Sequence, residues 1–169
     1  MAFLTAYQVG QYALQAGIPK SSLATMIAIA DAESSFNTTA IGDTTLENAE
    51  WGPSVGLWQI RSVKAEYGTG QDRDSSRLTD PLFNAQAAYQ ISSGGVNFGA
   101  WTTYTSGKYL QYMTTAQAAA SQLVGSSSQP SIPTQIEHSV TKHPFIYLAG
   151  ASLVALAGVY AYRTLGKSS

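Results

Sequence analysis

Apolar and polar positions in the N-terminal part of the chain follow the period of an α-helix. Thr5 is a residue type that caps helix starts, and the helix predicted after it ends at Gly17. Ser21 or Ser22 can cap a second helix over residues 23–34, where apolar side chains recur at intervals of three and four positions. This pattern predicts two helices that each turn an apolar face toward a common core.

The middle of the chain changes from loop to helix. Residues 37–55 are rich in Asn, Thr, Gly and Pro, which predicts a loop, and the short apolar run at 56–60 predicts a strand or a buried turn. Asp80, followed by a proline, opens a predicted helix over 81–92, and a further helix is predicted over 107–123. Long alternating strands and internal repeats are missing from the sequence. We therefore expect a mainly α domain with at most a small β element.

The composition changes again toward the C-terminus. Residues 124–143 are rich in Ser, Pro and Thr, which is typical of a flexible linker. Residues 144–162 contain no charged residue, and as a helix they would span roughly 28 Å, close to the bilayer hydrocarbon core of about 30 Å. The alternative is a helix buried in a protein core. The predicted organisation is a domain at 1–123, a linker at 124–143, one transmembrane helix at 144–163 and a short basic tail at 164–169.

Charge and composition narrow the classes of ligand. Lys and Arg total 9 against 10 Asp and Glu, and no basic patch stands out, which argues against a nucleic-acid partner. Charged residues make up 11% of the chain, against about 25% in ordinary domains, which suits an uncharged polar ligand such as a glycan. The chain has no cysteine and no Asp, Glu or His cluster with metal-ligand spacing, so we predict no metal and no cofactor. The N-terminus lacks the positive region of a secretory signal peptide.

One carboxylate stands out on the predicted helix at 23–34. Leu23, Met26, Ile27 and Ala30 form an apolar stripe, and Glu33 continues it, seven positions after Met26. A carboxylate directed along a core-facing stripe is costly unless it is paired or protonated. Burial and the negative end of the helix dipole both raise its pKa, which suits a general acid. The alternative is a helix-end carboxylate that faces solvent or pairs with an arginine.

Three blocks in a fixed order resemble lytic transglycosylases and goose-type lysozymes. Glu33 and Ser34, at the end of a helix, match the E-S motif of these families. The run GLWQI at 56–60 matches their G-L-x-Q-I block, and Ala88 with Tyr89 matches an A-Y step on a later helix. The resemblance covers roughly residues 5–115 and implies a lysozyme-like fold with a substrate cleft.

The chain is also similar to muramidase domains associated with phage virions, such as those in tape-measure proteins of actinobacterial phages or in tectivirus-like virions. In these domains a G-P-S-x-G-L-W-Q-I run is followed by G-T-G, R-L-T-D-P and N-F-x-x-W. The corresponding runs in this chain begin at Gly52, Gly68, Arg77 and Asn97.

The resemblance implies a mechanism for Glu33. It would protonate the glycosidic oxygen between MurNAc and GlcNAc, and in transglycosylases the same residue then takes the proton of the MurNAc 6-hydroxyl, which gives a 1,6-anhydro end. A hydrolytic lysozyme would instead need a second carboxylate about 5–9.5 Å away. Asp43, Glu47 and Glu50 follow Glu33 in the chain and could supply it, so both outcomes stay open at this stage.

The resemblance also assigns polar contacts in the cleft. Ser34 would orient Glu33 or the sugar, Gln59 would hydrogen-bond an N-acetyl or hydroxyl group, and Tyr89 would hydrogen-bond Glu33 and tune its pKa. Each has an alternative as an ordinary structural residue: a polar helix end for Ser34, a polar neighbour of the core for Gln59, and a core tyrosine for Tyr89.

Three further residues are predicted to shape the cleft. Gly56 would let the backbone approach the sugar closely, and Trp58 and Trp101 would stack on sugar faces, with core packing as the alternative for both tryptophans. The chain departs from the family after the A-Y step, where many transglycosylases have Asn-Ala-Gly and residues 90–92 are Gln-Ile-Ser. This departure affects the distal subsites rather than the acid.

The resulting hypothesis is an enzyme that opens the bacterial wall during phage entry or release. Its partners would be peptidoglycan glycan strands, a lipid bilayer and other virion membrane proteins, and its location a phage virion membrane or, alternatively, the host cell membrane. Two other classes remain: a catalytically silent wall-binding or structural virion protein, and a cellular membrane-bound autolysin.

Overall fold

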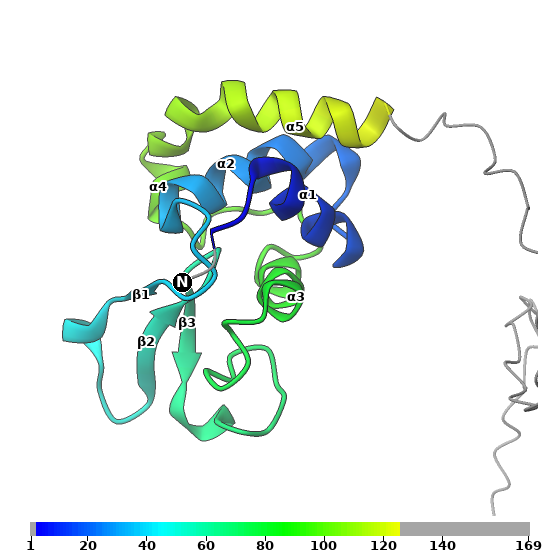
Figure 1. The fold of residues 1–169 in the computed structure, drawn as a ribbon. Helices are drawn as coiled ribbons and strands as arrows, with labels where there is room; N and C mark the ends of the chain where they lie inside the picture. The colour runs from blue at the N-terminus through cyan, green and yellow to red at the C-terminus, as the bar shows by residue number, and fades with distance from the viewer. Residues whose placement is uncertain (1–2, 126–169) are drawn as a thin grey trace, which may run out of the picture. The chain divides into compact units, whose positions relative to one another are not determined.

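The computed structural model describes residues 3–125, in which helices gather on one side of a small antiparallel sheet (Figure 1). The helices are α1 (Ala6–Gln15), α2 (Leu23–Ser34), α3 (Pro81–Ile91), α4 (Thr102–Thr105) and α5 (Met113–Gly125), and the strands are β1 (Ile41–Gly42), β2 (Trp51–Val55) and β3 (Ile60–Val63). Short 3-10 turns lie at Lys20–Ser22, Thr44–Leu46, Lys64–Glu66 and Lys108–Tyr112.

Helix α1 begins and ends where the sequence predicts. The Thr5 hydroxyl accepts a hydrogen bond from the Gln8 backbone N–H (3.2 Å), and the Gln8 side chain accepts one from the Thr5 N–H (2.9 Å). This reciprocal pair satisfies two backbone donors at the helix start. Gly17, with a φ of +100°, stops the helix, because only glycine adopts this conformation without steric cost.

Helix α2 lies at the centre of the helical side and packs against α1, α4 and α5. The predicted boundaries at 23 and 34 are confirmed, although the Ser22 side chain makes no capping hydrogen bond. The four residues of the predicted apolar stripe are fully buried, and Ala28 and Ile29, which lie off the stripe, are fully buried as well. A helix surrounded by other elements needs apolar residues on all its faces.

The predicted loop at 37–55 is partly wrong, because β1 and β2 lie within it. The sheet has the order β1-β2-β3, with Ile41 opposite Val55 and Val55 opposite Ile60. The register shifts between Trp51 and Ser54, where Gly and Pro interrupt the strand and hide it from a propensity-based prediction. In the apolar run at 56–60, residues 56–59 form the turn that joins β2 to β3, and Ile60 begins β3.

The later helices agree with the sequence prediction only in part. Helix α3 is capped as predicted, since the Asp80 carboxylate accepts from the Phe83 N–H at 2.8 Å. The predicted helix at 107–123 is displaced: Gly107 has a φ of +77°, a 3-10 turn follows, and α5 starts at Met113. Helix α5 also runs two residues past the predicted domain boundary at 123, to Gly125.

Within residues 3–125, no helix is long and apolar enough to cross a membrane. The predicted transmembrane helix at 144–163, the basic tail at 164–169 and all but the start of the predicted linker at 124–143 lie outside the described residues.

Candidate active site

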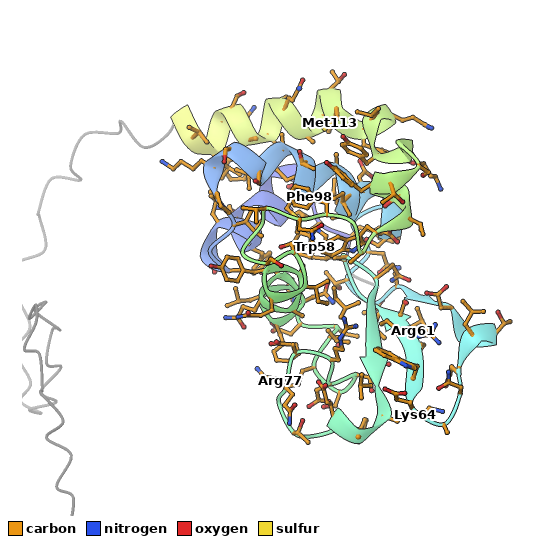
Figure 2. All side chains as sticks on the ribbon, turned by 180° about the vertical axis from the view of Figure 1, so that it is seen from behind. Trp58, Arg61, Lys64, Arg77, Phe98 and Met113 are labelled. Atoms are coloured by element: carbon orange, nitrogen blue, oxygen red, sulfur yellow. The ribbon has the colours of Figure 1, made fainter. Side chains whose placement is uncertain are left out.

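A cavity of about 690 Å³ opens between the C-terminal end of α2, the sheet and the segment that leads into α4. Figure 2 shows Trp58 between the helices and the sheet, and Arg61 on the sheet side. The cavity, called the cleft below, is lined by Glu33, Asp43, Leu46, Trp51, Ser54, Gln59, Ile60, Arg61, Arg73, Ile91, Ala100, Trp101 and Thr102.

Glu33 lies in the cleft as the sequence predicts, half-buried at the end of α2. Burial raises the pKa of its carboxyl group, and the negative charge of Asp43 raises it further. A hydrogen bond from Thr103 and the positive charge of Lys108 act in the opposite direction, without cancelling the rise. Glu33 therefore holds its proton to a higher pH than an exposed glutamate, which is what a general acid requires.

The contact with Thr103 was not predicted. The Thr103 hydroxyl in α4 donates a hydrogen bond of 2.6 Å to Oε1 of Glu33, across 70 positions of sequence. Within residues 3–125, the other carboxyl oxygen of Glu33 has no hydrogen-bond partner. Thr103 thus fixes one oxygen of Glu33 and leaves the other for a ligand in the cleft.

The raised pKa of Glu33 has a consequence for stability. The folded state favours the protonated carboxyl, so as the pH rises above the ordinary value of 4.5, ionisation stabilises the unfolded chain more than the folded one. Glu33→Gln removes this effect and can still accept the hydrogen bond of Thr103. We expect the variant to melt about 2–4 °C higher at neutral pH. Thermal unfolding at a series of pH values should show this gap shrinking as the pH falls from the raised pKa toward 4.5, and no gap below 4.5. A constant gap would contradict the assignment.

Gln59 also lies in the cleft, as predicted, and its side chain is tied to the backbone around it. Its Nε2 donates to the carbonyls of Gly56 (2.9 Å) and Ala40 (3.2 Å). Its φ of +46° places it in the left-handed region, which is strained for a residue with a side chain. Since both amide hydrogens already have partners, the acceptor oxygen is the part of Gln59 that remains for a ligand.

The prediction that Trp58 stacks on a sugar is wrong. Trp58 is fully buried, and its indole N–H donates to the Met26 carbonyl at 2.9 Å. Trp101 lines the cleft but is only 5% exposed, and its indole N–H donates to the Trp58 carbonyl at 2.8 Å. Trp51, on β2, is half-buried and lines the cleft, so it is the better candidate for stacking.

Ser34 and Gly56 support the cleft from outside its lining. The Ser34 hydroxyl lies 3.0 Å from the Ala30 carbonyl and 2.8 Å from the Leu57 carbonyl, which ties α2 to the turn after β2. Gly56 has a φ of +81°, and a Cβ there would come within 2.4 Å of the Leu78 carbonyl oxygen. The glycine is therefore required because the turn packs closely against other parts of the protein. The predicted reason, close approach of the backbone to a sugar, is not what the structure shows.

Tyr89 does not occupy the predicted position beside Glu33. Its ring packs against Gly17 and Gly94, and the hydrogen bond predicted for its hydroxyl is made to Glu33 by Thr103 instead. The A-Y block therefore contributes to the core rather than to the cleft.

Asn84 is a structural residue that sequence reasoning missed. It is fully buried on α3, and its Nδ2 donates to the carbonyls of Val55 (2.9 Å) and Leu78 (3.0 Å). Its Oδ1 accepts a hydrogen bond from the backbone N–H of Trp58 at 2.9 Å. These bonds satisfy backbone groups at the end of β2, in the turn that carries Gln59 and at Leu78, so Asn84 holds that turn in place beside the cleft.

Of the three candidates for a second carboxylate, only Asp43 lines the cleft. It accepts a hydrogen bond from the Ser54 hydroxyl at 2.6 Å and lies 3.7 Å from Nη1 of Arg61. Glu47 pairs instead with Lys64 at 3.7 Å, and Glu50 is exposed.

Comparison with protein families gives one result that covers this whole region. A family model described as a lysozyme-like domain matches residues 10–103, a range that includes every residue of the cleft lining and ends at Thr103. Comparisons with curated proteins and with solved structures found no match.

Proposed function

The chain belongs to the lysozyme-like domain family, and from this premise we propose that it cleaves the MurNAc–GlcNAc bond of peptidoglycan with Glu33 as the acid. Membership of this family indicates a peptidoglycan glycosidase. The observation that carries the residue assignment is the half-buried Glu33 in the cleft, whose pKa is raised and whose Oε1 is fixed by Thr103.

The proposed reaction is that of a lytic transglycosylase. Protonated Glu33 gives its proton to the glycosidic oxygen as the bond from that oxygen to MurNAc C1 breaks. The resulting carboxylate then accepts the proton of the MurNAc 6-hydroxyl, whose oxygen attacks C1 and closes a 1,6-anhydro ring. One carboxyl group serves both steps and no water is consumed.

The surroundings of Asp43 favour this route over hydrolysis. Among the described residues, Asp43 is the only carboxylate besides Glu33 that lines the cleft, and it already contacts Ser54 and Arg61. Both contacts are made by Oδ2 of Asp43, and the charge of Asp43 is paired with Arg61. The transglycosylase route needs no second carboxylate as a reactant.

The products decide between the two routes. The full-length chain is incubated with purified peptidoglycan in water enriched in oxygen-18, and the released muropeptides are weighed by mass spectrometry. We expect anhydro ends, lighter than hydrolysed ends by one water and without the label. Labelled reducing ends would identify a hydrolytic lysozyme and point to Asp43. If the folded protein releases no muropeptides, the proposed enzymatic activity is wrong, and a wall-binding role is the alternative that remains.

Thr103→Val tests how Glu33 is tuned. The hydrogen bond from Thr103 lowers the pKa of Glu33, so its loss should raise that pKa and keep the acid protonated to higher pH. We expect the alkaline limb of the pH–rate profile to move to higher pH. Thr105→Val is the matched control, since its exposed hydroxyl bonds only within α4. An unchanged alkaline limb, or a shift to lower pH, would contradict the assigned role.

We also propose that residues 144–163 anchor the enzyme in a membrane, in a phage virion or in its host. The uncharged stretch at 144–162 supports this. The full-length chain should float with lipid vesicles in a density gradient, and a chain ending at Gly125 should not. Detection of the protein in purified virions but not in uninfected cells would support the phage location, and the reverse would indicate a cellular autolysin.

A further inference from the structure

The charges of the cleft leave one cation without a counterion. Asp43 and Arg61 pair at 3.7 Å, and Glu33 accepts a hydrogen bond from Thr103 and has no arginine or lysine in an ion pair with it among the described residues. Arg73 also lines the cleft, and within residues 3–125 it forms no ion pair. The Arg73 guanidinium is therefore a cation in the cleft that is not paired with a carboxylate of the described residues.

The Arg73 side chain is held in place against the wall of the cleft. Its Nη1 donates to the Arg61 carbonyl at 2.7 Å, and its guanidinium carbon lies 5.4 Å from the ring centre of Trp51. Within the described residues, its remaining N–H groups have no protein partner. A guanidinium has five such donors in a planar fork, so most of this fork is available to a ligand.

The backbone of Arg73 is also held in place, by two hydrogen bonds. Its N–H donates to Oε2 of Glu66 at 2.8 Å, and its carbonyl accepts from the Val63 N–H at 3.1 Å. These two bonds attach the loop that carries Arg73 to the end of β3 and to the turn that follows.

Asp74, the next residue, organises the same loop. It is buried and accepts hydrogen bonds from Ser76 (Oγ, 2.7 Å) and from the N–H groups of Gly68, Gly70 and Ser76, each at 2.9 Å. These bonds, chiefly that of the Ser76 hydroxyl, hold the pKa of Asp74 far below its usual range. The Asp74 charge is thus committed to its own loop and does not pair with Arg73.

Arg73 lies where the cleft meets a second cavity. This neighbouring space of about 470 Å³ shares Arg73 and Ile91 with the cleft and is otherwise lined by Glu66, Gln71, Asp72 and Gln90. Arg73 is therefore positioned to contact a branch that extends from a glycan in the cleft toward the second cavity.

We propose that Arg73, supported by Trp51, binds a carboxylate on the branch that MurNAc carries; this rests on the proposed function for the nature of the substrate. MurNAc bears a lactyl group whose carboxyl is free in peptide-free strands and is joined by an amide to the stem peptide in intact peptidoglycan. The stem peptide has carboxylates of its own. A guanidinium fork suits a carboxylate because it can donate two parallel hydrogen bonds. A polymer of GlcNAc alone has no such group.

The test measures binding rather than cleavage, in the Glu33→Gln background so that ligands are not consumed. Three oligosaccharides of equal length are compared: chitooligosaccharide, peptide-free peptidoglycan glycan and glycan that retains its stem peptides. Adding Arg73→Gln should weaken binding of a carboxylate-bearing ligand about tenfold or more and leave chitooligosaccharide binding unchanged. If only the peptide-bearing glycan binds more weakly, Arg73 contacts a carboxylate of the stem peptide. If only the peptide-free glycan binds more weakly, Arg73 contacts the lactyl carboxylate.

Two control variants separate recognition from support of the loop. Arg77→Gln should change none of the affinities, because the guanidinium of Arg77 packs over Phe83 and lines neither cavity. Arg73→Lys keeps the charge without the fork and should show an intermediate loss, and thermal unfolding checks that each variant is folded.

If Arg73→Gln weakens the binding of all three ligands equally, or weakens the binding of none of them, the proposal is overturned. Failure of both carboxylate-bearing ligands to bind the parent variant would overturn it as well. If wild type cleaves no peptidoglycan while the Arg73-dependent binding is found, only the proposed function fails.

Discussion

Glu33→Gln should lower the rate of peptidoglycan cleavage by about 10²–10⁴-fold, the usual contribution of a general acid. Glutamine keeps the size of the side chain and can accept the hydrogen bond of Thr103, so the geometry of the cleft should survive. It has no proton of suitable acidity to give to the glycosidic oxygen. The measurement is the initial rate of turbidity loss in a suspension of purified peptidoglycan, with thermal unfolding as the check on folding.

Asp31→Asn is the matched control for this prediction. Asp31 lies on the same helix, is also partly buried, and has a pKa raised by burial, but it does not line the cleft. Its substitution should leave the rate within about twofold of wild type. A Glu33→Gln variant as active as wild type, or an equal loss in both variants, would show that Glu33 is not the acid.

Gly56→Ala should destabilise the domain by about 2–5 kcal/mol. The added methyl group would lie 2.4 Å from the Leu78 carbonyl oxygen and 2.5 Å from Nδ2 of Asn84, at a φ of +81°. Backbone on one side and the buried Asn84 on the other leave it no room, so the turn that carries Gln59 would have to shift. Chemical denaturation of wild type and variant measures the change in the free energy of unfolding.

Gly68→Ala separates crowding from backbone strain. Gly68 has a similar φ of +74°, but a Cβ there would meet nothing within 4 Å. Its substitution should therefore cost only the strain of the left-handed conformation, about 1–2 kcal/mol. Equal losses at Gly56 and Gly68 would mean that packing against Leu78 and Asn84 is not what requires the glycine.

Local signals in the sequence predicted the ends of α1 and α2 and the start of α3, but not the start of α5. The reciprocal hydrogen bonds of Thr5, the cap at Asp80 and the stop at Gly17 each depend on residues within a few positions of one another. The sheet was missed for the opposite reason. Strand β1 has only two residues and β2 contains Gly52 and Pro53, so these strands are specified by pairing with β3 rather than by their own composition.

In the candidate site, too, features set by nearby residues could be predicted, and features set by distant contacts could not. Glu33 and Gln59 were placed in the cleft from the pattern and the family resemblance, and both line it. Thr103 could not be found, because its hydrogen bond to Glu33 spans 70 positions and a threonine in a short polar helix carries no signal. Trp58 was predicted to stack on sugar, but the sequence does not reveal that its indole N–H reaches the Met26 carbonyl in the core.

Muropeptide release by three full-length proteins tests whether the cleft cleaves peptidoglycan with Glu33 as its one catalytic carboxyl group. Wild type, Glu33→Gln and Asp43→Asn are incubated with the same purified peptidoglycan, and the soluble products are quantified after folding has been confirmed. We predict release by wild type and by Asp43→Asn, which can still accept the hydrogen bond of Ser54, and release lowered by about 10²–10⁴-fold in Glu33→Gln. Release by Glu33→Gln at the wild-type rate, or no release by wild type, would contradict cleavage through Glu33. Loss of release in Asp43→Asn would show that a second carboxylate is required.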